Sequence, residues 1–554
     1  MSFQGYTMPP PSGGLDLTTP VDNMEPTSAL ELTNIFPGAG APTVRLGYQQ
    51  FCDLGVTAPI QFMHEFPRPD GTVELIVAQA TKLYSISSTG VKTDISKVGG
   101  YTSGKWNKEM FGNNQFGYYF YVANSYGDAP QVYKGGGLVA ANINASTRGG
   151  AVAITELCNV AAYRTRLYFI QRNTLVMWYD KSAGSVFTTA SGTLDSYDFS
   201  GIFRRGGYLL FTGSYTNQSG VTSQDYFMAV SSEGEIVMYS GSSPDATASD
   251  AGGAWNLVAH FIIGKPLGPK AFIRINQDIW IITQQGIVPV SALFQADPEQ
   301  ALTAVSYKIN PLISQYATQV ATSEMWTGFF YPAGRRVYVV LPDSTSTSSL
   351  LVYSIDSKSW TQFQLYSGEH SIAACKYNNL PFYGSNRGVI YQGETGYADA
   401  VSGSGTGEAI TFAARSAFSF YGSRGNYKAF KDIRQINKAK RGLTLQLGLD
   451  TDFKRQSILT NVITPLSIFT AWGSRWGSNG VAYTPYRVPG DPAVPPITVP
   501  IYYQPWSGDV EYIFDRYAVA GQGHCAAIRF GGSIKNSSCQ FIGFEIRYDL
   551  GGQV

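Results

Sequence analysis

The chain has 554 residues and a formal net charge of +1, so no global electric field directs it toward nucleic acid or an anionic membrane surface. Hydrophobic residues make up 44% of the sequence, which excludes a disordered chain, and the length allows about two to four domains. The 60 glycines, 36 tyrosines and 31 phenylalanines predict an all-β protein in which glycine-containing turns join aromatic strands.

The cysteines and the hydropathy pattern indicate the kind of compartment. The five cysteines are odd in number, far apart and form no CxxC pair, so we expect neither a disulfide framework nor a zinc site. We therefore expect the protein to work in a reducing environment. The first residues lack the features of a secretory signal. No run approaches the roughly 20 apolar residues that cross a bilayer, so no membrane-spanning segment is expected.

Residues 1–48 predict an extended N-terminal arm that packs on the C-terminal platform or on a neighbouring subunit. Three prolines open it at Pro9–Pro11, and only residues 28–34, between Pro26 and Pro37, have room for a turn or two of helix. Residues 1–12 are equally compatible with a flexible leader. The apolar anchors of the arm, which are candidates for inter-subunit contacts, are Leu15, Leu30, Leu32, Ile35 and Phe36.

Residues 49–398 predict a degenerate β-propeller of about six blades. Short apolar strand cores recur every 40 to 60 residues or so, which is the length of one four-stranded blade, and most are followed by a turn and a second strand. An array of β-sandwiches or a β-solenoid is the alternative. The strand cores are residues 82–86, 118–122, 166–170, 226–230, 278–282, 336–340 and 380–384.

Residues 335–363 illustrate the unit from which the propeller is built. Two apolar runs flank a polar loop at residues 342–349, and a third strand begins at Trp360, so we expect a three-stranded meander. We interpret Trp360 as a packing residue between blades. Helices should be scarce, and one short helix is expected near residues 310–317.

A Gly/Ser linker at residues 399–407 predicts a boundary, and residues 408–554 predict a separate C-terminal β domain. Residues 409–415, 442–449 and 541–548 alternate between apolar and polar side chains, as half-buried strands do. We expect a sandwich-like platform, or a partial barrel, of about six to eight strands.

No arrangement of residues predicts catalysis, a cofactor or a bound metal. The four histidines share no metal-ligand spacing, and the chain has neither a phosphate-binding GxxxxGK[ST] loop nor a GxSxG elbow. Two other functions remain open. A propeller glycoside hydrolase needs two carboxylates whose separation a sequence does not show. A carbohydrate-binding adhesin would use exposed tryptophans, for which the candidates are Trp178, Trp255 and Trp326.

One cluster of positive charge stands out in the C-terminal domain, with Asp432 as its only acidic residue. Seven cations within 18 residues could bind the phosphates of a nucleic acid. The same cations are also typical of a solvated edge strand, or of a face that docks an acidic partner. The aromatics among them are few for a stacking platform, which favours docking or edge protection over DNA contact. The cations are Arg424, Lys428, Lys431, Arg434, Lys438, Lys440 and Arg441.

The two ends of the chain and the early propeller resemble the tail nozzle proteins of short-tailed bacteriophages, also called tail tubular or packaged-DNA-stabilisation proteins. The similar segments are Gly14–Asp16, Pro20, Met24–Pro26, Ala29–Ile35 and Gly47–Tyr48, then Tyr119–Asn124 with Asp128–Pro130, and finally Ile546–Gly552. Leu46 departs from the family pattern, in which a second basic residue or proline often stands, and this puts a pairing role for Arg45 in doubt.

The resemblance implies a structural, non-enzymatic protein of the virion tail, made in the cytoplasm of the bacterial host. Six copies would form a ring below the portal and its adaptor ring, retain the packaged genome and conduct double-stranded DNA during ejection. The outside of the ring would carry tail fibres or spikes. A near-neutral chain suits such a channel, because a conduit should not bind DNA tightly.

Overall fold

The structure is a computed structural model, and its described part is built almost entirely of β-strands. Among the described residues the one α-helix is α2 (Asn310–Gln319), at the predicted place. The model describes residues 4–38, 40–113, 117–135, 146–147, 152–180, 193–219, 222–250, 252–294, 304–320, 325–342, 348–366, 368–403, 405–439, 444–455, 462–463, 511–514 and 516–553.

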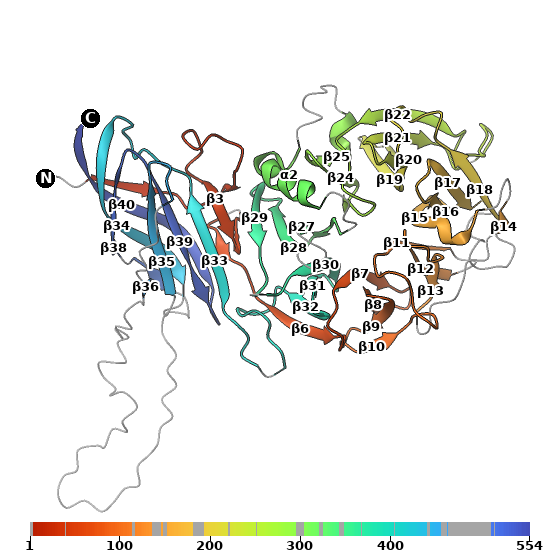
Figure 1. Cartoon of the computed structure of the whole chain (residues 1–554), viewed down its shortest axis with the longest axis horizontal. Helices are drawn as coiled ribbons and strands as arrows, with labels where there is room; N and C mark the ends of the chain where they lie inside the picture. Colours follow the sequence, from red (N-terminus) through yellow and green to blue (C-terminus); the bar gives the residue numbers. More distant parts are fainter. Residues whose placement is uncertain are drawn as a thin grey trace, which may run out of the picture.

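The predicted β-propeller is confirmed. Six blades consist of strands that follow one another along the chain, and they stand around a common centre (Figure 1). The first three are β7 (Ile60–Pro67), β8 (Val73–Gln79), β9 (Lys82–Ile86) and β10 (Lys92–Asp94); β11 (Asn107–Asn113), β12 (Gly117–Ala123) and β13 (Gln131–Tyr133); and β14 (Ser146–Thr147), β15 (Leu157–Tyr163), β16 (Arg166–Gln171), β17 (Val176–Asp180) and β18 (Thr193–Asp198).

The next three blades continue the same meander, and a further sheet closes the ring. The blades are β19 (Leu209–Ser219), β20 (Thr222–Ser231), β21 (Glu235–Ser240) and β22 (Asn256–Ile262); β23 (Phe272–Ile275), β24 (Asp278–Thr283) and β25 (Gly286–Pro289); and β26 (Thr327–Tyr331), β27 (Arg336–Pro342), β28 (Ser348–Ser354) and β29 (Ser359–Phe363). In the closing sheet, β30 (Ser371–Tyr377), β31 (Leu380–Ser385) and β32 (Val389–Gly393) pair with β6 (Tyr48–Asp53), which precedes the first blade.

The local sequence explains why these strands form. Each predicted strand core falls in a different one of these sheets, and the apolar side chains pack between neighbouring blades. Several tight turns need a left-handed backbone, which Gly90, Gly234 and Gly388 adopt with φ of 82–83°. The predicted meander at residues 335–363 is β27, β28 and β29; most of its polar loop, residues 343–347, lies outside the described residues.

The C-terminal platform is a sandwich of two sheets, as predicted. One sheet contains β34 (Asn426–Ala439), β40 (Cys539–Gln553), β38 (Arg516–Gly523), β37 (Glu511–Ile513), β1 (Gln4–Met8), β4 (Ile35–Phe36) and β5 (Thr43–Val44). The other contains β33 (Ile410–Ser416), β39 (Ala526–Ile534), β35 (Thr444–Thr451) and β36 (Val462–Ile463). Phe530 on β39 packs on Phe541 and Phe544 on β40, with ring centroids 4.8 Å apart in both pairs.

The arm joins the platform to the propeller. Its strand β3 (Ser28–Thr33) pairs with β33 of the platform on one edge and with β29 of the last consecutive blade on the other. Its short strand β2 (Gly14–Leu15) pairs with β3. Propeller blade and platform therefore share one continuous ten-stranded sheet, which crosses the middle of the molecule (Figure 1).

The helical turn considered for residues 28–34 is wrong, because this segment is strand β3. Ala29, Leu30 and Leu32 favour helix when isolated, but here backbone pairing along both edges of the segment overrides that propensity. Asn34 ends the strand with φ of 58°, a left-handed conformation that asparagine tolerates.

All five cysteines, Cys52, Cys158, Cys375, Cys525 and Cys539, are buried and unlinked. Within the described part of the chain, no helix has the length and apolar character that a membrane crossing requires.

Candidate interaction surfaces and central cavity

Arg45 forms the centre of the junction between arm, propeller and platform. It is 2% exposed, and its Nη1 and Nη2 donate to both carboxylate oxygens of Asp399 at 2.6 and 2.5 Å. Nε donates to Asn34 Oδ1 at 2.9 Å, and the two Nη atoms also donate to the carbonyls of Leu46 and Gln364. The pairing role that the family pattern left in doubt is therefore present.

The surroundings of this pair keep it away from water. The guanidinium of Arg45 lies 4.6 Å from the ring centroid of Phe363, and Asp399, the first residue of the predicted linker, is 1% exposed. Burial raises the pKa of the Asp399 carboxyl, and the charge of Arg45 opposes that rise. An enclosed ion pair with its donors satisfied holds three chain segments in one geometry.

The five apolar arm residues pack within their own chain. Four of them are at most 4% exposed, and Leu30 is partly buried against Phe418 and Ala527. Their role in this structure is to anchor the arm along the platform and the adjoining blade. The anchors are Leu15, Leu30, Leu32, Ile35 and Phe36.

The predicted basic cluster does not form one uniform surface. Lys428 is fully buried, and its Nζ donates to the carbonyls of Asn426 and His524 at 3.0 and 2.9 Å and to that of Ser423. Burial lowers the pKa of this amine. Lys428 is thus a structural residue, while Lys440 and Arg441 lie outside the described residues.

The remaining cations of β34 belong to a mixed-charge face, which we call the outer platform face. Arg434 contacts Glu545 of β40 at 3.2 Å, and Lys431 contacts Asp549 at 3.5 Å. The carboxylate of Asp432 accepts from Arg516 at 2.7 Å and from Arg547 at 2.6 Å. Burial works against the charge of Asp432, but these hydrogen bonds outweigh it and lower its pKa.

Aromatic rings border this face at the edge strand β37. The Nζ of Lys438 lies 5.9 Å from the ring centroid of Tyr512, and Arg434 lies 5.2 Å from that of Phe514. The two rings are stacked on each other, and they are 59% and 49% exposed. Arg424 stands apart, against Phe420. Strands β34, β38 and β40 lie on the side of the platform away from the propeller (Figure 1).

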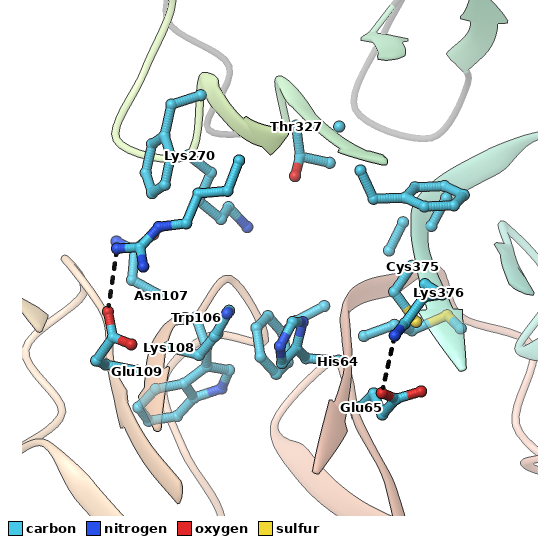
Figure 2. A pocket seen from close by; sticks show the side chains of 18 of the residues that line it. His64, Glu65, Trp106, Asn107, Lys108, Glu109, Lys270, Thr327, Cys375 and Lys376 are labelled. Atoms are coloured by element: carbon cyan, nitrogen blue, oxygen red, sulfur yellow. Dashed lines mark hydrogen bonds and ion pairs between the residues drawn. The ribbon is translucent and has the colours of Figure 1, made fainter. Parts of the chain in front are cut away.

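A cavity of about 490 Å³ occupies the centre of the propeller. One edge strand of each blade and of the closing sheet lines it, namely β7, β11, β15, β19, β23, β26 and β30. Figure 2 shows lysines from different strands converging on one space, with His64 between Lys108 and Lys376. The charged side chains of its wall are Glu65, Lys108, Glu109, Lys270, Arg274 and Lys376.

Both carboxylates of the cavity already have cationic partners. Lys376 Nζ lies 3.4 Å from Glu65, and Arg274 Nη2 lies 3.5 Å from Glu109. Removal from bulk water lowers the pKa of Lys108 to about 8. It also lowers the pKa of His64 well below its usual value, with a further contribution from the nearby cations. At neutral pH His64 is therefore uncharged and Lys108 is mostly protonated.

The tryptophans proposed as a carbohydrate-binding surface do not form one. Trp178 is 5% exposed and Trp326 is fully buried, while Trp255 is half-buried and stacked on Tyr239. Trp360, predicted as a packing residue, is 1% exposed and donates from Nε1 to the carbonyl of Val305. Among the described residues, no three His, Cys, Asp or Glu side chains gather as metal ligands would.

Comparisons with known proteins give remote structural matches only. No family model and no curated protein matches the sequence. A streptogramin B lyase structure matches with a TM-score of 0.38 at 10% identity, over 62% of this chain and 96% of that one. The virginiamycin B lyase from Staphylococcus aureus matches with a TM-score of 0.39 at 10% identity, over 62% of this chain and 98% of that one. The structure of YCF48 bound to D1 peptide matches with a TM-score of 0.34 at 13% identity, over 63% of this chain and 98% of that one.

Proposed function

We propose that this chain is a structural subunit of the tail of a short-tailed bacteriophage, where six copies form the nozzle below the portal and its adaptor ring. The ring retains the packaged genome, conducts double-stranded DNA during ejection and offers its propellers to fibres or spikes. The residues that resemble tail nozzle proteins motivate the proposal. The chain acts in it as a scaffold and not as an enzyme.

The continuous ten-stranded sheet is the observation that supports this role most directly. A subunit that links a central ring to peripheral fibres must transmit force without hinging between its two bodies. Here β3 pairs with both the propeller and the platform, and the buried pair of Arg45 and Asp399 closes the same junction. An ordinary interdomain connection is a linker that permits relative motion.

The outer platform face is the surface that we assign to contacts within the assembly. It is ordered by β-pairing along its length and carries both signs of charge, so a partner of complementary pattern gains specificity without a large apolar area. Its cations are offset by Asp432, Glu545 and Asp549, which suits protein contacts better than tight binding to DNA.

Assembly with the cognate adaptor tests the proposed function. Purified chain is mixed with the adaptor ring of the same virus and examined by negative-stain electron microscopy and native mass spectrometry. We expect rings of six copies on the adaptor. Monomers in the absence of adaptor are compatible with assembly on a template, whereas compact monomers that persist with the adaptor ring contradict the proposal.

Removing charge from the outer platform face should impair assembly and leave folding intact. In the double variant Arg434→Gln/Arg516→Gln we expect the urea midpoint to change little, because these ion pairs lie at the surface, where such pairs contribute about 0–1 kcal/mol each, and Asp432 keeps Arg547 as a partner. Ring formation on the adaptor should fall strongly. The matched control is Arg204→Gln/Arg205→Gln, two exposed arginines on the propeller. Equal losses of assembly in the two double variants would reject this face as a contact.

A further inference from the structure

The platform sheet that carries the outer platform face has an open strand on each side. Strand β38 pairs with β34 on one side, and β1 pairs with β40 on the other. Among the described residues, neither strand pairs with a further strand along its outward side. An open strand offers its outward backbone N–H and C=O groups to another chain.

These two strands lack the features that usually prevent pairing between molecules, which are lysine, proline and very short length. The outer strand of the first blade has two of them, because β10 is three residues long and begins with the exposed Lys92. By contrast, β1 and β38 have five and eight residues and contain neither lysine nor proline. The register of β38 shifts beyond Ala518, so its regular free segment is residues 516–518.

The strand order allows opposite sides of two copies to join. Pairing is antiparallel from β1 to β40, from β40 to β34 and from β34 to β38, so strand directions alternate across this series. Because the number of strands is even, β1 of a second copy in the same orientation runs antiparallel to β38 of the first. A head-to-tail contact of this kind can repeat around a closed ring.

The two open strands also lie level with each other. Pairing through β40 and β34 connects residues 5–7 of β1 with residues 516–518 of β38. A second copy placed beside the first, without a shift along the strands, therefore brings these two segments together. The three connected rows are Gly5, Arg547, Asp432 and Ala518; Tyr6, Ile546, Ile433 and Tyr517; and Thr7, Glu545, Arg434 and Arg516.

Charge complementarity favours a second copy as the occupant. Arg516 Nη2 lies 3.5 Å from the carboxylate of Glu545, which stands two strands away across β34. In the head-to-tail contact, Glu545 of the partner subunit stands two strands away on the opposite side, across the short side chain of Thr7. Arg516 then lies between two carboxylates, one from each copy. Gly5 and Ala518, in the neighbouring row, are exposed and too small to obstruct the contact.

We propose that β38 of one copy pairs antiparallel with β1 of the next, through residues 516–518 and 5–7, and joins neighbouring platform sheets into one continuous sheet. The inference rests on the proposed ring and names the contact between its subunits. A junction of this length is weak by itself, since isolated strand pairs are marginal in water. Each subunit of a closed ring makes two such junctions, which favours assembly on a template over assembly of free chains.

Thiol cross-linking of full-length chains tests the pairing. Gly5→Cys and Ala518→Cys are prepared separately and mixed under mild oxidation, with and without the adaptor ring. A Cβ at Gly5 meets no atom within 4 Å, and both positions are exposed, so the variants should fold. Residues opposite each other in antiparallel strands have Cβ atoms about 4.5–5.5 Å apart, within reach of a disulfide after a small adjustment. We expect linked dimers in the mixture and none in either variant by itself.

The control uses the exposed Lys535, which follows β39 in the other platform sheet. Gly5→Cys mixed with Lys535→Cys should give no linked dimer. A test mixture that cross-links no more than this control overturns the proposal. Dimers of Ala518→Cys alone would show two-fold pairing of β38, and a link from Ala518→Cys to the adaptor would show another occupant. Either result also overturns it.

Hydrogen exchange of the wild-type chain measures the backbone pairing and needs no variant. Ring formation on the adaptor should slow the outward amides of residues 5–7 and 516–518 about tenfold or more and leave those of β10 unchanged. Rings that lack either the cross-link or this protection overturn the strand pairing and leave the proposed function standing. Cross-linked chains that form no ring on the adaptor support the pairing and contradict the proposed function.

Discussion

Replacement of Arg45 by methionine is expected to lower the free energy of unfolding by about 3–5 kcal/mol, as removal of one partner from a buried ion pair does. The variant leaves the Asp399 carboxylate enclosed without a cation and removes the donor that serves the carbonyls of Leu46 and Gln364. Urea unfolding of variant and wild type under identical conditions measures the difference. The propeller should also become separable from the platform, visible as faster proteolysis between them.

Two further variants test whether the burial of the Arg45–Asp399 pair is the cause of this loss of stability. Arg335 pairs with Asp356 at the surface, where the side chains are 61% and 37% exposed, so Arg335→Met should cost no more than about 1 kcal/mol. The double variant Arg45→Met/Asp399→Leu should be more stable than Arg45→Met, because it removes the stranded carboxylate. A loss as large in Arg335→Met as in Arg45→Met contradicts the explanation.

Truncation of Trp360 to alanine is expected to lower the free energy of unfolding by about 3–5 kcal/mol relative to wild type, the usual effect of removing a fully buried tryptophan. Its ring lies 4.9 Å from that of Tyr353, its Nε1 donates to the carbonyl of Val305, and Gly14 of the arm packs against its backbone. Urea unfolding and hydrogen exchange of the arm measure the loss, since both the blade and the arm lose support.

The conservative variant separates the two contributions of this side chain. Trp360→Phe retains most of the apolar contact and leaves the Val305 carbonyl without its donor, so it should cost about 1–2 kcal/mol. If Trp360→Ala unfolds at the same urea concentration as wild type, the side chain does not support the junction.

The propeller could be predicted because its strands are local units. In β27, β-branched and aromatic residues follow one another for most of the strand, and the partner strand begins within a few residues of its end. Strand β3 could not be predicted in this way. Its partners β29 and β33 come more than 300 residues later, and its own residues favour helix. Long-range pairing of this kind leaves no local pattern.

The candidate surfaces were only partly visible in the sequence for a similar reason. A run of cations along one segment says nothing about which side of a strand each occupies, and Lys428 points inward. The carboxylates that balance Arg434 and Lys431 come from β40, at Glu545 and Asp549. The residues that line the central cavity come from strands of every blade, so no spacing of residues in the sequence predicts the cavity.

The burial of all five cysteines makes the chain suited to site-selective labelling. Burial raises the pKa of Cys52, Cys375, Cys525 and Cys539, which keeps these thiols protonated, and Cys158 is 8% exposed. Thiols introduced at the exposed Ser88 of the propeller and Lys535 of the platform would react without removal of any native cysteine. Energy transfer between dyes at these two positions would then read out, molecule by molecule, whether the propeller and the platform move as one body.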